Sequence, residues 1–295
     1  MNWAVAGRAV ERGRKEGAAS LSKRSILITG ASSGIGLDAA CSLRRRGWRV
    51  LAACRRDEDA ARLSTAGVEP FLLDLASDGS VAALAGEVLE RTGGRLDALF
   101  NNAAFATPGA VEDLPRVALR EIFEVNLFGQ IDLTNRLLPA MRLAGSGRVV
   151  MNSSVLGLVA APWRGAYVAT KFALEGITDA LRLELAGSGV HVILIQPGPI
   201  DTPFRRNSIP HFERHIDWRT SPHQSAYETR LLPRLYADTP GPGQHPASSV
   251  TARLIEALES RRPRARYAVT GTTRGAAIMR RLFPTALSDR ILRLR

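Results

Sequence analysis

Short apolar runs alternate along the chain with longer stretches whose apolar residues recur at helical spacing. The first runs are SILITG (25–30), RVLAAC (49–54) and VEPFLLD (68–74), and a helical pattern follows the first at 37–47. Because these runs are apolar at nearly every position, they are typical of parallel strands that helices cover on both faces. The pattern predicts the α/β class.

The alternation continues to residue 198 and returns near the end of the chain. Further strands are expected at LDALFNNA (96–103), GRVVMNSS (147–154), VHVILIQPG (190–198) and RYAVTG (266–271), with helices at 80–91, 112–141, around Tyr167 and at 247–260. We therefore predict one doubly wound Rossmann-type domain over residues 23–271, with a mostly parallel seven-stranded sheet and helices on both faces.

Three segments depart from this alternation. Residues 1–22 are basic and rich in Ala and Gly, and we expect a disordered extension there. Residues 199–246 hold eight prolines and are interpreted as a lid-like insertion over the substrate site. Residues 272–295 form a basic amphipathic tail that Pro284 interrupts. Such a tail either lies on an anionic membrane or docks on its own domain or a neighbouring subunit.

The formal net charge of +12 raises nucleic acid and anionic membranes as partners. The basic residues crowd the two ends of the chain, however, and no nucleic-acid-binding motif is present, so we expect no nucleic-acid partner. Cys41 and Cys54 fit neither a disulfide framework nor a zinc site. No run resembles a secretion signal or a membrane span, and a cytoplasmic location is expected, with weak peripheral membrane contact through the tail left open.

A glycine-rich turn, TGASSGIG (29–36), follows the first predicted strand and opens the first predicted helix. In this context Gly30 permits a sharp turn, Gly34 lets the backbone approach a pyrophosphate, and Gly36 allows the helix to pack closely on the sheet. The backbone of Ser32, Ser33 and Ile35 belongs to the same expected phosphate site. The alternative is that the glycines serve only a tight turn.

The end of the second strand is expected to select the cofactor. A carboxylate at this point binds the ribose 2′-hydroxyl and repels a 2′-phosphate, but here the strand is followed by Arg55 and Arg56, and no acid occurs before Asp57. Because a guanidinium suits a phosphate, we predict NADP(H), with Arg55 as the first candidate and Arg56 as the second. The alternative is two solvated arginines at a helix start.

The following two strands end in further candidates for the cofactor site. Asp74 and Leu75 end the third strand, where we expect them near the adenine, and Asn102 and Ala103 follow the fourth. These predictions depend on position alone. The residue types add little, because polar residues end many strands.

YVATK places Tyr167 and Lys171 four residues apart, on one face of the expected helix. The spacing alone is common. Together with the glycine turn, NNAA (101–104), VNLFG around Asn126, NSS (152–154) and PGPIDT (197–202), the chain resembles the short-chain dehydrogenase/reductase family over residues 23–202. Its departures, Ala104 for a frequent glycine and Thr170 for a frequent serine, remove no reacting group.

This resemblance implies a catalytic tetrad of Asn126, Ser154, Tyr167 and Lys171, and a homodimer or homotetramer. Tyr167 is the expected acid/base in hydride transfer between NADP(H) and a carbonyl, and the Lys171 ammonium is expected to favour its phenolate. Ser154 would bind the substrate oxygen, and the family spacing selects it over Ser153. Asn126 would hold a water that connects Lys171 to solvent.

PGPIDT follows the sixth strand, so Pro197, Gly198, Ile200 and Thr202 are expected near the nicotinamide, although Thr202 also fits a plain turn. The substrate pocket is expected to include the side chains of Ser154, Leu156, Trp163 and Phe204.

The long C-terminal extension and the PGPIDTPF stretch are most similar to the hydroxysteroid and retinol dehydrogenase branch. This predicts a lipophilic alcohol or carbonyl substrate. The alternative function is a non-catalytic protein that senses NADP(H) on the same fold.

Overall fold

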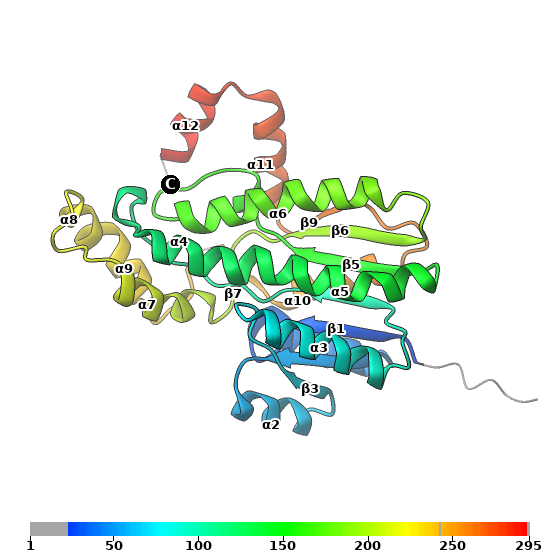
Figure 1. Cartoon of the computed structure of the whole chain (residues 1–295). Coiled ribbons are helices and arrows are strands. Elements are labelled where there is room, and N and C mark those ends of the chain that lie inside the picture. Colours follow the sequence, from blue (N-terminus) through cyan, green and yellow to red (C-terminus); the bar gives the residue numbers. More distant parts are fainter. Residues whose placement is uncertain (1–22, 242, 294–295) are drawn as a thin grey trace, which may run out of the picture.

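The computed structural model describes residues 23–241 and 243–293, so the extension predicted for residues 1–22 lies outside the described residues. Its centre is one sheet of order β3-β2-β1-β4-β5-β6-β9, in which all neighbouring strands are parallel (Figure 1). The strands are β1 Ser25–Thr29, β2 Arg49–Cys54, β3 Glu69–Leu72, β4 Ala98–Asn101, β5 Gly147–Asn152, β6 Val190–Gln196 and β9 Arg266–Ala268. The predicted seven-stranded Rossmann-type fold is confirmed.

The strand order reverses between β1 and β4, which are neighbours in the sheet although β2 and β3 separate them in the chain. In parallel sheets of this kind, the loops that leave these two strands turn in opposite directions and open a crevice at the carboxyl edge. The glycine turn follows β1 and NNAA begins at the end of β4, so both border this crevice.

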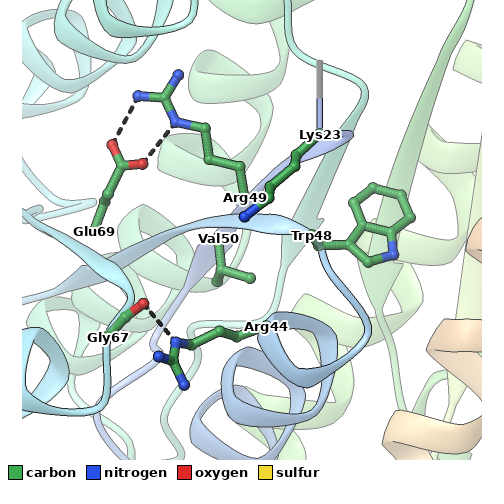
Figure 2. Close-up of a pocket in the computed structure, with 7 residues that line it drawn as sticks. All are labelled: Lys23, Arg44, Trp48, Arg49, Val50, Gly67 and Glu69. Carbon is green, nitrogen blue, oxygen red and sulfur yellow. Dashed lines mark hydrogen bonds and ion pairs between the residues drawn. The ribbon is translucent and has the colours of Figure 1, made fainter. Parts of the chain in front are cut away.

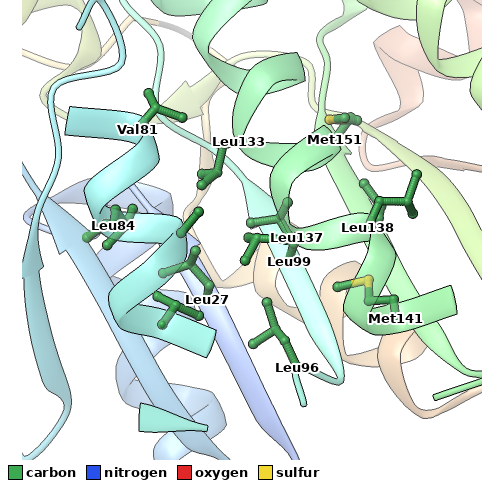
Figure 3. Close-up of a cluster of buried hydrophobic side chains, with 14 of the residues drawn as sticks. Leu27, Val81, Leu84, Leu96, Leu99, Leu133, Leu137, Leu138, Met141 and Met151 are labelled. Carbon is green, nitrogen blue, oxygen red and sulfur yellow. The ribbon is translucent and has the colours of Figure 1, made fainter. Parts of the chain in front are cut away.

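Helices cover both faces of the sheet (Figure 1). On one face, α3 Asp78–Arg91, α5 Gly129–Leu143 and α6 Gly165–Glu184 pack on a core of leucine, valine and methionine, part of which Figure 3 shows. On the other, α1 Gly34–Arg45, α2 Asp57–Thr65 and α10 Ser248–Glu259 enclose a second core. The near-continuous apolar character of the strands follows from this double coverage.

The helix expected at 112–141 is divided. A short 3₁₀ turn (η1 Val111–Asp113) precedes α4 Arg116–Phe123, and a π-helical turn (η2 Glu124–Phe128) connects α4 to α5. Pro115 caps α4, where its fixed φ is compatible with a helix start. π-Helical turns often occur at functional sites, and Asn126 lies in this one.

The proline-rich insertion forms regular structure that the sequence pattern did not predict: α7 Phe204–His215, α8 Gln224–Ala226, the π-helical turn η4 Tyr227–Leu231 and α9 Leu232–Leu235. It has its own apolar cluster around the buried Phe212 and Tyr227. The pairing of β7 Ile200–Asp201 with β8 His245–Pro246 ties its two ends together. The insertion is therefore a packed subregion and not a loose loop.

The tail forms α11 Gly271–Leu282 and α12 Thr285–Arg293, so the interruption at Pro284 is confirmed. α11 buries Ala276 and Met279, and Arg280 donates to the carbonyl oxygen of Gly157 at 3.1 Å. Docking on its own domain therefore holds for α11. Four large apolar side chains remain exposed (Ile278, Leu282, Phe283 and Leu287), and membrane contact stays a prediction. Among the described residues, no helix has the length and apolar character needed to cross a bilayer.

An open cavity of about 590 Å³ lies at the amino edge of the sheet, opposite the crevice (Figure 2). Arg49 pairs with Glu69 in it through two hydrogen bonds, and Arg44 donates to the carbonyl oxygen of Gly67 at 2.8 Å. Its charged groups are thus largely partnered within the protein, and it shares no residue with the glycine turn.

Gly129 is expected to be indispensable for the packing of α5. A Cβ at this position would stand 2.0 Å from the carbonyl oxygen of Leu75, whereas a Cβ at Gly86, an exposed position of α3, meets nothing within 4 Å. Gly129→Ala should lower the free energy of unfolding by about 1–3 kcal/mol. Gly86→Ala should raise it by about 0.5–1 kcal/mol through helix propensity. Urea denaturation measures both, and equal midpoints for the two variants would contradict this packing.

Candidate active site

The glycine turn leaves an open cradle at the N-terminus of α1. Gly30 and Gly34 have φ of 65° and 54°. This left-handed backbone conformation is one that residues other than glycine rarely adopt. A Cβ at Gly36 would stand 2.2 Å from the carbonyl oxygen of Gly30. Ser33 caps the helix without a side-chain hydrogen bond. Free N–H groups and the positive end of the helix therefore face a space that suits a pyrophosphate.

Thr202 closes this cradle from the other side of the crevice. A Cβ at Gly34 would lie 3.1 Å from the side chain of Thr202, so the PGPIDT segment meets the glycine turn directly. Ser32 and Ile35 are half-buried within the same turn. The structure thus brings together two motifs that lie far apart in sequence.

The loop after β4 is fixed by Thr29 at the end of β1. The hydroxyl of Thr29 accepts from the backbone N–H of Asn102 at 2.9 Å and of Ala103 at 3.0 Å. The Asn102 amide donates to the carbonyl oxygen of Thr29 at 3.0 Å, and its oxygen accepts from Asn152 at 2.9 Å. Asn102 is therefore held between three strands, and its side chain shapes the crevice floor.

The two arginines after β2 differ in their partners. Arg56 pairs with Asp59 at 3.0 Å, which holds the pKa of that carboxyl below its usual range. Arg55 is exposed and has no ion pair or hydrogen bond with any residue that the structure describes. Of the two, Arg55 is therefore the one whose guanidinium has no partner among the described residues, and its binding of a phosphate stays a prediction.

Asp74 and Leu75 occupy the turn after β3. The Asp74 carboxylate accepts from the backbone N–H of Ala76 at 3.0 Å, and Leu75 is buried in the core beside Gly129. Asp74 therefore stabilises its own turn, and the side chain of Leu75 points into the protein. Contact with an adenine stays a prediction for both residues.

Ser154 and Tyr167 face one another at the carboxyl edge of β5. The Ser154 hydroxyl caps a short 3₁₀ turn (η3 Val155–Gly157) by accepting from Leu156 N–H at 3.1 Å. Burial raises the pKa of the Tyr167 phenol well above its ordinary value, and a hydrogen bond from the Ser154 hydroxyl partly opposes this shift. Ser153 is buried with no partner for its hydroxyl among the described residues. The choice of Ser154 over Ser153 agrees with this geometry.

Lys171 is fully enclosed one turn along α6 from Tyr167. Its Nζ donates to the carbonyl oxygen of Asn152 at 2.7 Å and lies 5.5 Å from the centre of the Tyr167 ring. Burial lowers the pKa of Lys171 to about 8, and the carboxylate of Glu175 partly opposes this. The sequence led us to expect that Lys171 lowers the pKa of Tyr167, but burial raises that pKa and the opposing contribution comes from Ser154.

Asn126 positions the loop beside the crevice. Its amide donates to the carbonyl oxygen of Phe105 at 2.9 Å and its oxygen accepts from Phe105 N–H at 3.0 Å. The same amide donates to the hydroxyl of Thr170 at 3.3 Å, which ties the π-helical turn to α6. The side chain is buried and fully occupied in this way. The water expected to connect it with Lys171 stays a prediction.

The residues predicted for the nicotinamide end are close to the tetrad. Pro197 accepts from Val155 N–H at 2.7 Å, and a Cβ at Gly198 would stand 2.2 Å from the Thr270 hydroxyl. Ile200 packs at the margin of the second core. This segment therefore runs tightly between the Ser154 turn and the start of α11.

The three predicted pocket residues besides Ser154 do not lie together. Phe204 packs edge-to-face on Tyr167, with ring centres 5.3 Å apart, and Leu156 is half-buried in the turn that Ser154 caps. Trp163 packs on Tyr227 of the insertion at 5.0 Å. Phe204 thus packs on Tyr167 and Leu156 contacts Ser154 through its backbone N–H, while Trp163 supports the insertion.

Sequence reasoning missed two residues that hold Lys171. Asn152 supplies the carbonyl that binds its ammonium, and Glu175 supplies the nearest carboxylate. Glu175 accepts from Gln196 at 2.9 Å and from Arg266 at 3.1 Å. The position of Glu175, one turn beyond Lys171 on the same helix face, was a usable signal. The role of Asn152 depends on backbone geometry that no pattern reveals.

Comparison with known proteins settles the family. The model of the short chain dehydrogenase family matches residues 24–212, from β1 through the tetrad to the lid helix α7. The chain belongs to the short-chain dehydrogenase/reductase family. The family match covers the glycine turn, Ser154, Tyr167 and Lys171 together.

Relatives extend the similarity over most of the chain. The uncharacterized oxidoreductase YbbO of Escherichia coli is 41% identical over 270 residues, covering 92% of this chain and 94% of that protein. Human 17-beta-hydroxysteroid dehydrogenase type 1 is 34% identical over 257 residues, covering 83% of this chain and 77% of that protein. This chain is thus an oxidoreductase that resembles the hydroxysteroid branch.

Solved structures of short-chain dehydrogenases share the fold with either cofactor. One from Burkholderia phymatum in complex with NAD has a TM-score of 0.75 at 25% identity, covering 91% of this chain and 95% of that chain. One from Burkholderia cenocepacia in complex with NADP has a TM-score of 0.72 at 25% identity, covering 92% and 98%. Both cofactors therefore occur among its structural neighbours.

The pKa of Lys171 is directly measurable, because only three of the 40 basic residues are lysines (Lys15, Lys23 and Lys171). Nitrogen NMR of lysine-labelled protein should give a value near 8 for the buried ammonium. Glu175→Gln should lower it further, since the carboxylate favours the charged form. Glu184→Gln, on the exposed end of the same helix, should leave it unchanged. A Lys171 that titrates near 10.5 would refute its burial.

Proposed function

We propose that this protein is an NADP(H)-dependent oxidoreductase that interconverts an alcohol with its ketone or aldehyde. The observation that carries the proposal is the juxtaposition of Ser154, Tyr167 and Lys171 at the carboxyl edge of the sheet, beside a glycine cradle that suits a dinucleotide. The nicotinamide cofactor supplies the hydride that the protein itself lacks.

Tyr167 acts as the acid/base. Burial keeps its phenol protonated at neutral pH, which suits the reduction direction, where it donates a proton to the carbonyl oxygen. Ser154 hydrogen-bonds that same oxygen and stabilises its developing charge. Lys171, with a pKa of about 8, carries a positive charge at neutral pH and assists the proton transfer from one turn away. Asn126 holds the crevice loop against α6, and its role is to position these groups.

The preference for NADP(H) follows from Arg55. An exposed guanidinium without an ion-pair partner among the described residues stands after β2, whereas the neighbouring Arg56 is already paired with Asp59. A 2′-phosphate would supply the missing partner for Arg55, whereas a bare 2′-hydroxyl would not. The cradle of Gly30, Gly34, Gly36 and Thr202 would bind the pyrophosphate.

Arg55 should therefore decide cofactor preference. Fluorescence titration of the wild type should show tighter binding of NADPH than of NADH, and Arg55→Ala should weaken NADPH binding about ten- to a hundredfold, the range of a charge-assisted hydrogen bond. NADH binding should change little. Arg56→Ala is the matched control, because Arg56 already pairs with Asp59. If NADH binds as tightly as NADPH to the wild type, the assignment fails.

We propose a lipophilic substrate. The apolar groups bordering the phenol, Phe204 and Leu156, favour one, and so does similarity to human 17-beta-hydroxysteroid dehydrogenase type 1. A steroid, a retinoid or another long apolar carbonyl would meet this requirement. A homodimer or homotetramer, and contact of the exposed apolar side chains of the tail with a membrane, belong to the same proposal.

Catalysis should depend on one hydroxyl. Tyr167→Phe should lower kcat for reduction of an apolar aldehyde by about 10²–10⁴, the usual contribution of a positioned acid, while NADPH binding changes little. Tyr236→Phe, which removes an exposed hydroxyl bonded to Glu213, should match the wild type. A variant at Tyr167 with full activity would remove the phenol from the mechanism. A wild type that binds NADPH but reduces no aldehyde or ketone would favour a cofactor sensor.

A further inference from the structure

Arg164 stands at the start of the catalytic helix, three residues before Tyr167. It caps α6, and its backbone forms a bridge with Gly109 in the loop after β4. The preceding residue, Trp163, has a left-handed backbone with φ of 66°, a rare conformation for a bulky side chain. The backbone is therefore strained at Trp163, in the turn directly before Arg164 and α6.

The guanidinium of Arg164 has no partner among the residues that the structure describes. Its Nη1 is completely enclosed, yet it makes no hydrogen bond. Burial lowers the pKa of this guanidinium, and the nearby charge of Arg234 on α9 has the same sign. An arginine has five N–H donors and no way to lose its charge at ordinary pH, so an enclosed Nη1 without an acceptor is costly.

Other partly buried arginines of this chain are satisfied. Arg148 donates to the carbonyl oxygens of Ala257 and Ser260, at 3.1 and 2.6 Å. Arg266 pairs with two carboxylates of α6, those of Glu175 and Asp179. Arg164 thus departs from the pattern of its own chain, and the departure occurs one helical turn from the reacting phenol.

The carboxylates of the neighbouring loop are already engaged. Asp113 accepts from the hydroxyls of Ser221 and Tyr227, both at 2.7 Å. Glu112 pairs with His223. If Asp113 paired with Arg164 instead, the hydroxyls of Ser221 and Tyr227 would lose their acceptor. If Glu112 did so, its pair with His223 would break. Arg164 as a whole is half-buried, so a ligand anion could reach its guanidinium and supply the acceptor that these carboxylates do not.

We propose that Arg164 binds a carboxylate carried by the substrate, at the end of an apolar body whose other end holds the reacting carbonyl. The inference rests on the proposed function and narrows its substrate class to lipophilic oxo acids and the corresponding hydroxy acids. A guanidinium binds a carboxylate through two parallel hydrogen bonds, so Arg164 fixes the orientation of the substrate as well as its charge. Phe204 and Leu156 enclose the apolar part beside Tyr167.

The test compares straight-chain ω-oxo acids of four to twelve carbons with their methyl esters, each reduced with NADPH. The ester keeps the aldehyde and the chain but loses the charge. At the best length, the wild type should prefer the acid in kcat/KM by about tenfold or more, the range expected for a charge-assisted hydrogen bond. Arg164→Met should abolish this preference, leaving acid and ester nearly equal.

Arg234→Gln is the control for a general electrostatic effect, because it removes the nearest like charge from the exposed side of the insertion. It should keep the acid preference of the wild type. Equal kcat/KM for acid and ester at every length in the wild type would overturn the proposal. An equal loss of preference in the Arg164 and Arg234 variants would also overturn it, since that result indicates a diffuse field and no specific contact.

A second measurement is independent of turnover. Saturated dicarboxylic acids of matching length, which cannot be reduced, should raise the melting temperature of the wild type but not of Arg164→Met. If the esters and the acids are all inert, the proposed function fails. The Arg164 site then survives only if this stabilisation is observed, and its absence overturns the site as well. Because the variant removes an unpaired charge, its own melting temperature should equal or exceed that of the wild type.

Discussion

A single enclosed ammonium, that of Lys171, constrains much of the surrounding structure. A charge taken out of water is tolerated only where fixed dipoles or opposite charges replace its hydration. Here the direct replacement is one backbone carbonyl, that of Asn152 at 2.7 Å. The stability of the buried charge therefore depends on keeping that carbonyl, and the more distant carboxylate of Glu175, in place.

Two hydrogen-bond chains do this from opposite sides. Asn152 is bonded to Asn102, which is bonded to Thr29, so the carboxyl ends of β5, β4 and β1 are fixed to each other below the crevice. On the far side, Gln196 of β6 and Arg266 of β9 hold Glu175. The same bonds that satisfy the lysine therefore set the relative positions of the cofactor cradle and the catalytic helix.

The sequence predicted those parts of the site that local chemistry determines. Left-handed turns at Gly30 and Gly34 require glycine, and the spacing of Tyr167 and Lys171 follows from helix geometry, so both are visible in a linear pattern. The partners Asn152 and Thr29 were not predicted, because each acts through a contact made only when distant strands align. Glu175 was missed although its spacing from Lys171 on the same helix was a usable signal. The insertion was equally hidden: α7 contains Pro210 in its interior, so local propensity opposes a helix that tertiary packing around Phe212 stabilises.

The charges of the site are arranged asymmetrically. Two carboxylates of the helices around the site are already paired, Asp59 of α2 with Arg56 and Glu175 of α6 with Arg266. Arg55, Lys171 and Arg164 are among the cations that have no direct ionic partner among the described residues. Unpaired like charges in a partly enclosed cleft repel one another and cost stability, so their persistence favours ligands that supply the anions. On this argument the positive crevice is an incomplete structure by itself, and the cofactor phosphates and an anionic substrate would neutralise it from two ends.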